Sequence, residues 1–310
     1  MINQYRENYR RINNSSQNTE LIYPLSNRGF FSEINNLALA VLFCLENKIN
    51  LKIYSKNWVG GKWEDYFNPV LQEYNGFVPI PSDIFSIRRE DKFYAFYHKS
   101  IKKRKILQDS IWTEMRSKPF IDTNFYYPEL GIKGGIFEAK KQVFDLILDY
   151  NKRTEQEVFF VDNANPEFIK NSCGIQVRRG DKVNGKNREA ESFDVQLYIN
   201  KILEINTSIK NITICTDDYR VLKDFQKQFP EFHYLSLCDP SRIGYFQREY
   251  NNTTDDSKIR DEVINVLKDA NLLINSKMFI GTYSSNIARF VVLMRNNKDC
   301  YSLDIDWTPL

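Results

Sequence analysis

The second half of this chain alternates short apolar runs with amphipathic segments, and this alternation limits its possible folds more than any other feature. Strands are predicted at 174–177, 211–215, 232–237 and 277–281, and helices at 193–205, 219–229, 261–271 and 287–294. Strands that alternate with helices in this way form parallel βα units. The pattern therefore predicts an open parallel sheet, which binds ligands at the carboxyl ends of its strands.

The first half is less regular. A glycine turn at 29–36 leads into a helix rich in Ala and Leu at 37–44, a buried strand follows at 50–54, and a second helix is predicted at 135–150. Residues 79–170 are predicted to be mostly helical, and the basic run at 102–105 is interpreted as the solvated face of a helix.

Chain length favours two domains over one, since 310 residues exceed the size at which a single core usually stops growing. The predicted organisation is a flexible polar N-terminus at 1–20, an N-terminal α/β domain at 21–165 and a C-terminal domain at 166–310.

Composition excludes several classes of protein. The net charge of +3 gives no general attraction to nucleic acid, and no apolar run reaches the roughly 20 residues of a membrane span. The polar N-terminus lacks the apolar core of a signal peptide, so we expect a soluble, cytoplasmic protein. Five cysteines in mostly apolar segments predict buried thiols, and two histidines without a Cys-x-x-Cys pair offer little for a zinc site.

One predicted strand ends in an unusual cluster, Arg178-Arg179-Gly180-Asp181-Lys182. A planar guanidinium at the carboxyl end of a strand can grip a diphosphate with two parallel hydrogen bonds, and the glycine lets the backbone turn there. The alternative is a surface loop with solvated charges. The residues alone favour the two interpretations equally.

Two further strand ends carry polar side chains. Tyr283-Ser284-Ser285 precedes a predicted helix, whose N-terminal N–H groups can hold an anion, although either serine is also an ordinary helix cap. Asp217 and Asp218 follow another strand; paired acids there can bind a metal, but they position neighbouring groups equally well. We therefore predict no metal site.

These segments resemble the α-1,6-fucosyltransferase family, which includes enzymes that core-fucosylate N-glycans and bacterial enzymes that fucosylate nodulation signals. The similar segments follow the family's order between about residues 25 and 305, and they are the 29–36 turn, Asn57-Trp58, residues 61–64 and 67–69, residues 177–183, residues 216–218, Asp269, residues 281–285 and residues 302–304.

The resemblance implies a GT-B-like fold of two Rossmann-like α/β domains, with the nucleotide-sugar site in the C-terminal domain and a cleft for the acceptor. It also implies an inverting, metal-independent transfer of fucose from GDP-fucose to a glycan hydroxyl, with α-1,6 linkage and no cofactor. Animal family members carry a membrane anchor, a coiled-coil stem and an SH3-like domain, so we expect this chain to be a minimal catalytic unit.

The resemblance also assigns roles to individual residues. Arg178 and Arg179 would bind the diphosphate, Asp181 and Lys182 would shape the reactive centre, and Asp269 would read guanine. The remaining donor-site residues implied are Gln176, where the family has histidine, together with Asp217, Asp218, Tyr283, Ser284 and Ser285.

The base that deprotonates the acceptor hydroxyl is implied to be a glutamate shortly after the Asp181-Lys182 pair. The loop here is about three residues longer than in the family, and Lys186 stands at the ungapped position. Glu189 is our first choice of base and Glu191 the second.

Two alternatives to an α-1,6-fucosyltransferase stay open. One is a related GDP-sugar transferase that forms another linkage, such as α-1,2. The other is a non-catalytic protein that binds nucleotides or glycans and has lost its base.

Overall fold

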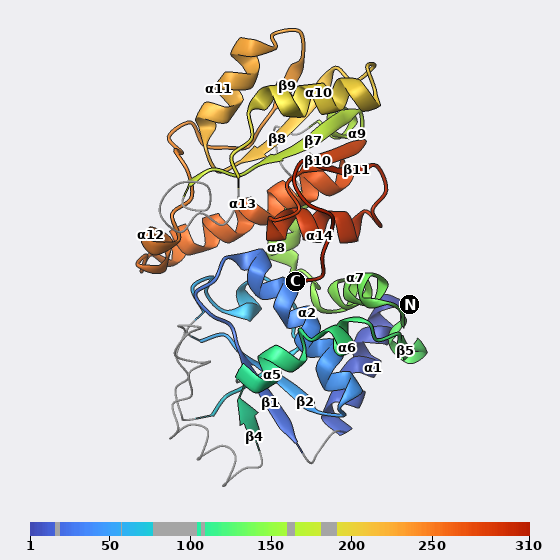
Figure 1. Ribbon diagram of the computed structural model, residues 1–310. Coiled ribbons are helices and arrows are strands. Elements are labelled where there is room, and N and C mark those ends of the chain that lie inside the picture. The colour runs from blue at the N-terminus through green and yellow to red at the C-terminus, as the bar shows by residue number, and fades with distance from the viewer. Residues whose placement is uncertain (16–18, 57, 77–103, 107–108, 160–164, 181–190) are drawn as a thin grey trace. The chain divides into compact units, whose positions relative to one another are not determined.

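The computed structural model describes residues 1–310 except 16–18, 57, 77–103, 107–108, 160–164 and 181–190. The chain divides into two compact units, both shown in Figure 1. Unit 1 contains residues 1–155, 254–260 and 309–310, and unit 2 contains residues 156–253 and 261–308.

Unit 1 is built on a parallel sheet with strand order β3-β2-β1-β4. Its strands are β1 (Glu20–Pro24), β2 (Asn50–Tyr54), β3 (Gln72–Glu73) and β4 (Arg104–Ile106). The helix α2 (Phe30–Glu46) joins β1 to β2. It is buried almost all round: residues 37–45 are apolar on every face, and the polar Glu33, Asn35 and Asn36 near its start are buried as well. The predicted helix at 37–44 and the strand at 50–54 are confirmed, but α2 begins at Phe30, so residues 30–36, which were predicted as a turn, are helical.

The rest of unit 1 consists of short helices, 3-10 turns and one antiparallel strand pair. These elements are α1 (Ile2–Ser15), η1 (Trp63–Asp65), α5 (Asp109–Glu114), α6 (Lys118–Ile121), β5 (Phe125–Tyr127), η2 (Pro128–Leu130), β6 (Ile132–Gly134) and α7 (Ile136–Ile147), followed by α8 (Lys152–Phe159), which runs into unit 2.

The N-terminal residues differ from the prediction of a flexible segment, because they form α1 and pack on the sheet. Tyr9 and Asn13 are buried. The Asn13 side chain donates to the carbonyl oxygen of Leu51 at 3.0 Å and accepts from its backbone N–H at 2.8 Å, so it bonds to β2 as a neighbouring strand would. The polar side chains of this helix therefore make specific hydrogen bonds, whereas they had been interpreted as a sign of flexibility.

The basic run at 102–105 also differs from its predicted helical form. Lys102 and Lys103 lie outside the described residues, while Arg104–Ile106 forms β4 beside β1. A tertiary pairing therefore overrides the local preference of this segment.

Unit 2 contains a five-stranded parallel sheet with strand order β11-β10-β7-β8-β9. Its strands are β7 (Ser172–Val177), β8 (Asn211–Thr216), β9 (His233–Leu235), β10 (Met278–Gly281) and β11 (Cys300–Ser302), and its helices are α9 (Pro166–Lys170), α10 (Val195–Ile205), α11 (Tyr219–Gln228), α12 (Gln247–Asn251), α13 (Asp256–Asn275) and α14 (Asn286–Met294). The predicted alternation of parallel strands and helices is confirmed, and α13 begins in residues assigned to unit 1.

Helices cover both faces of this sheet, with α10 and α11 on one side and α13 and α14 on the other (Figure 1). Alternate β7 residues, such as Ile175, pack in the core with α10 and α11. On the opposite face a Cβ added to Gly174 would lie 2.7 Å from Ser276 Oγ, directly after α13, and 3.1 Å from Leu273 Cδ2 on α13, so glycine allows this helix to approach closely.

The strand order reverses direction between β7 and β10. From β7 the chain adds β8 and β9 on one side, and it then returns to place β10 and β11 on the other. Ligands of open parallel sheets bind at such a switch point, outside the carboxyl ends of the strands. The loops that follow β7 and β10 therefore flank the expected ligand crevice of unit 2.

Candidate functional site

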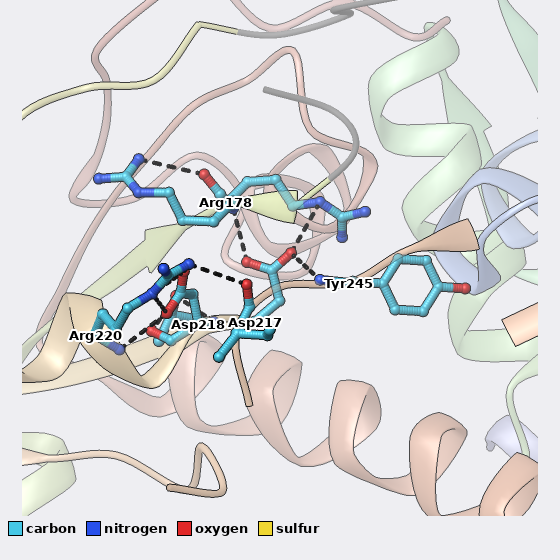
Figure 2. Close-up of polar contacts among 8 residues, drawn as sticks. Arg178, Asp217, Asp218, Arg220 and Tyr245 are labelled. Atoms are coloured by element: carbon cyan, nitrogen blue, oxygen red, sulfur yellow. Dashed lines mark hydrogen bonds and ion pairs between the residues drawn. The ribbon is translucent and has the colours of Figure 1, made fainter. Parts of the chain in front are cut away.

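Arg178 leaves the carboxyl end of β7 and lies between a carboxylate and an aromatic ring. Its Nε is 3.5 Å from Asp217 Oδ2, and its Cζ lies 5.1 Å from the centre of the Tyr245 ring. The Arg178 side chain is 27% exposed, whereas that of Asp217 is 9% exposed. Figure 2 shows the guanidinium held near the ring with Asp217 beside it. The cation is thus oriented by the protein and still reaches solvent.

Asp217 connects three segments of unit 2. Its Oδ1 accepts the backbone N–H of Arg179 at 2.7 Å, and its Oδ2 accepts the backbone N–H of Tyr245 at 3.2 Å (Figure 2). Because both carboxylate oxygens are engaged with the protein, this side chain organises the site.

Two glycines allow the loops to approach one another. Gly180 has φ +71° and Gly244 has φ +131°, values that favour glycine. A Cβ on Gly180 would lie 2.3 Å from the carbonyl oxygen of Tyr245, and one on Gly244 would lie 2.9 Å from Gly180 Cα. A side chain at either position would push the arginine loop away from the Tyr245 loop.

Two of the residues that the resemblance assigns to the donor site, Arg179 and Asp218, make contacts within the chain. The Arg179 guanidinium donates to the carbonyl oxygen of Phe193 at 2.9 Å. Asp218 caps α11 through the backbone N–H of Arg220 at 2.9 Å and also pairs with the Arg220 guanidinium at 2.5 Å, which lowers the pKa of Asp218. Both residues stabilise the loops around Arg178.

The loop after β10 is organised by Asp304. This carboxylate accepts the backbone N–H of Tyr283 at 2.7 Å and that of Ser284 at 3.2 Å, while the backbone N–H of Ser285 bonds to Thr282 at 2.9 Å. The backbone N–H groups predicted to hold phosphate are therefore already engaged within the chain. Ser285 occupies the cap position of α14 but makes no capping hydrogen bond through its side chain.

Asp304 stays ionised in this setting. Burial opposes ionisation, but hydrogen bonds from Ser284, Ile305 and Ser302 outweigh it and hold the pKa of this carboxyl below its ordinary value. Its negative charge lies where an anionic ligand of α14 was predicted.

Gln176 and Asp269 are associated with the α13 face of the sheet. Gln176 is buried on β7 in register with Cys215 on β8, and Cys215 Sγ contacts the backbone oxygen of Asp269 at 3.5 Å. Gln176 Oε1 accepts no hydrogen bond from any residue that the structure describes. Burial raises the pKa of Asp269 to about 7, against opposing effects of Cys215 and Arg242.

The remaining predicted residues are only partly placed. Asp181, Lys182 and Glu189 lie outside the described residues, and Glu191 is exposed just before α10. Tyr245 was missed by the sequence analysis, because it lies in a segment without periodicity; the neighbouring Gly244 was the one available signal.

Within the described ranges, no group of three or more His, Cys, Asp or Glu side chains has the arrangement of a metal site. Over the same ranges, no helix combines the length and the apolar character needed to cross a membrane.

Comparisons with known proteins agree with this architecture. The structure is similar to the NodZ α-1,6-fucosyltransferase from Bradyrhizobium, with a TM-score of 0.52, 14% identity and coverage of 89% of this chain and 93% of the other. It is also similar to a mutant of FUT1 from Arabidopsis thaliana, with a TM-score of 0.57, 10% identity and coverage of 99% of this chain and 78% of the other. At these identities the likeness shows a shared mixed α/β fold with parallel sheets.

No curated protein sequence matches the chain significantly. The model of the α-(1,6)-fucosyltransferase N- and catalytic domains, however, matches residues 141–302, which is more than half of the sequence. The predicted resemblance is confirmed: the chain belongs to the α-(1,6)-fucosyltransferase family and is a glycosyltransferase.

Proposed function

We propose that this protein transfers fucose from GDP-fucose to a sugar hydroxyl of a glycan, with inversion at the anomeric carbon, α-1,6 linkage and no metal ion. The observation that carries the proposal is the placement of Arg178 at the switch point of the unit 2 sheet, between Asp217 and Tyr245. Solved relatives support the choice of donor, since NodZ was studied with GDP-fucose and with GDP, and FUT1 with GDP.

Arg178 would act on the leaving group. The acceptor oxygen forms a bond to the anomeric carbon while the bond from that carbon to the diphosphate breaks, and GDP departs with the electron pair. A guanidinium can donate two parallel N–H bonds to phosphate oxygens, so it stabilises the negative charge as it develops. A fixed cation of this kind supplies the stabilisation that a divalent ion provides in other transferases.

The acceptor hydroxyl must lose its proton as it attacks. Glu189, with Glu191 as the second choice, would accept that proton, and Asp181 and Lys182 would shape the reactive centre around it. These roles rest on the family resemblance.

Asp269 and Gln176 would read the base. Guanine presents two donors, N1–H and the exocyclic amine, and an ionised carboxylate can accept from both. Uracil lacks this pair of neighbouring donors, so the same site would discriminate against UDP-sugars. In this proposal residues 166–310 form the donor domain and residues 21–165 the acceptor side of a GT-B-like fold.

The test is GDP release from purified protein with GDP-fucose, GDP-mannose or a UDP-sugar, with and without chito-oligosaccharides, in the presence of a chelator. We expect acceptor-dependent release from GDP-fucose alone, and the linkage of the product is then determined by NMR. Arg178→Ala should abolish release, while Arg248→Ala, which removes an exposed guanidinium of α12 in the same unit, serves as the matched control.

Release that requires a divalent ion would contradict the metal-independent mechanism. Turnover of another GDP-sugar, or a product with another linkage, would identify a related transferase. GDP binding without turnover of any donor would instead indicate a binding protein.

A further inference from the structure

We propose that Tyr245 is a positioning residue for Arg178, and that its ring fixes the plane in which the guanidinium meets the diphosphate. The inference rests on the proposed function of Arg178. No motif or sequence similarity pointed to Tyr245, and the proposal comes from its place against the arginine loop.

The ring contact suits this task. Arg178 Cζ lies 5.1 Å from the ring centre, within the range at which an aromatic face attracts a cation. A carboxylate holds a guanidinium by taking its N–H donors, whereas an aromatic face holds it without using them. A ring is therefore the better support for a cation that must donate to a ligand.

The backbone of Tyr245 is fixed independently of its ring. Its N–H donates to Asp217 Oδ2 at 3.2 Å, and its N and carbonyl O atoms lie so close to Gly180 that no side chain fits there. Asp217 therefore sets the positions of both partners, the cation and the ring.

The loop that carries Tyr245 is also anchored to two helices. The carbonyl oxygen of Arg242 accepts the backbone N–H of Tyr219 at 2.9 Å, and that of Ile243 accepts from the Arg220 guanidinium at 3.2 Å, both at the start of α11. The Arg242 guanidinium pairs with Glu262 on α13 at 2.6 Å. With supports on both sides, the ring is held in place before any ligand binds.

The first experiment compares GDP and guanosine binding to the wild type, Tyr245→Leu and Tyr245→Phe. Tyr245→Leu should weaken GDP binding about five- to thirtyfold while guanosine binding stays within about twofold, and Tyr245→Phe should restore GDP affinity. Ile243→Ala is the matched control, since Ile243 is 61% exposed in the same loop. An equal loss for both ligands would reveal a merely structural role and overturn the inference, as would unchanged GDP affinity in Tyr245→Leu.

A second experiment needs no nucleotide. Urea unfolding midpoints of Arg178→Ala, Tyr245→Leu and the double variant form a double-mutant cycle, and coupled side chains give non-additive shifts. If the wild type binds no GDP, the proposed function fails, yet the cycle still decides whether Tyr245 holds Arg178: a smaller shift in the double variant than the sum of the two single shifts shows that the ring and the guanidinium are coupled, and additive shifts overturn the inference.

Discussion

The loops after β7 and β10 leave neighbouring strands at the same edge of one sheet, and both carry residues suited to an anion, yet they are built differently. The β7 loop presents the guanidinium of Arg178, supported from two sides. In the β10 loop the backbone N–H groups of Tyr283 and Ser284 bind the carboxylate of Asp304.

The difference shows that the hydrogen-bond donors of a potential anion site can be occupied by a side chain of the same protein. A helix start attracts negative charge of any origin, and a carboxylate of the same chain is always present at high local concentration. Backbone N–H groups predict a ligand site only if no side chain of the protein reaches them. The cation of Arg178 is the stronger basis for a phosphate site in this molecule.

The largest expected effect tests the β7 loop. Arg178→Ala should weaken GDP binding by at least about 100-fold, because it removes two charge-assisted hydrogen bonds of about 1.5–3 kcal/mol each. Calorimetric titration with GDP measures the loss. Arg178→Lys keeps the charge but not the planar guanidinium, so its GDP affinity should lie between those of the wild type and Arg178→Ala. Equal affinity of wild type and Arg178→Ala would remove the distinction between the two loops.

Substitution of Asp304 tests the β10 loop. Asp304→Ala should lower the free energy of unfolding by about 2 kcal/mol, since several polar groups lose a charged partner. Urea denaturation measures this change, with the exposed Asp306→Ala as control. GDP affinity should change less than in Arg178→Ala; a larger loss would mean that Asp304 supports the ligand site more than the arginine does.

The pH dependence of GDP binding tests the residues proposed to read guanine, separately from the two loops. The pKa of Asp304 is lowered, so the carboxylate of the β10 loop does not titrate near neutrality. In the proposed function Asp269, whose pKa is raised to about 7, would have to ionise before it accepts hydrogen bonds from guanine. GDP affinity should rise by up to about tenfold per pH unit below pH 7 and level off above it.

The control for this prediction is Asp269→Asn, in which any pH dependence that remains belongs to the phosphates of GDP. The same raised pKa has a folding consequence of known sign. The folded apo protein favours protonated Asp269, so this contribution to stability is greatest below the ordinary carboxyl pKa and is lost as the pH rises through about 7. A stability profile identical in Asp269→Asn would contradict the shift.

The smallest effect concerns a hydroxyl of the β10 loop. Ser285 makes no side-chain capping bond, so Ser285→Ala should change the free energy of unfolding by less than about 0.5 kcal/mol. If the hydroxyl contacts phosphate, GDP affinity should fall by about three- to tenfold, the value of one neutral hydrogen bond. Unchanged affinity would show that the β10 loop contributes nothing through Ser285.

Periodicity was sufficient to predict the sheet of unit 2, because buried parallel strands and amphipathic helices leave clear patterns. It failed at α1, where Tyr9 and Asn13 are buried within a polar sequence, and no local rule identifies Asn13 as a partner of β2. The helix predicted from periodicity at 261–271 was also too short, because α13 spans Asp256–Asn275.

The site was predicted as a set of residue types but not as a set of roles. Arg178 and Asp217 were each predicted at the end of a strand, and the structure brings them together because β7 and β8 are neighbouring parallel strands. The inward turn of Arg179 and the contact between Asp304 and the β10 loop depend on partners 14 and 20 or 21 residues away in the chain. Tyr245, 67 residues after Arg178, could be found only from the folded chain.

The contact between Gly180 and Gly244 bears on how sequences of this kind can diverge. The close contacts of Gly180 fix the backbone two residues after Arg178, so insertions or deletions beyond Gly180 need not move the guanidinium. The family resemblance predicts that this sequence is longer in the segment after Gly180. Under the proposed function, the two glycines would separate the arginine that binds the donor from a segment that can vary in length, and acceptor preference could then evolve without loss of the donor site.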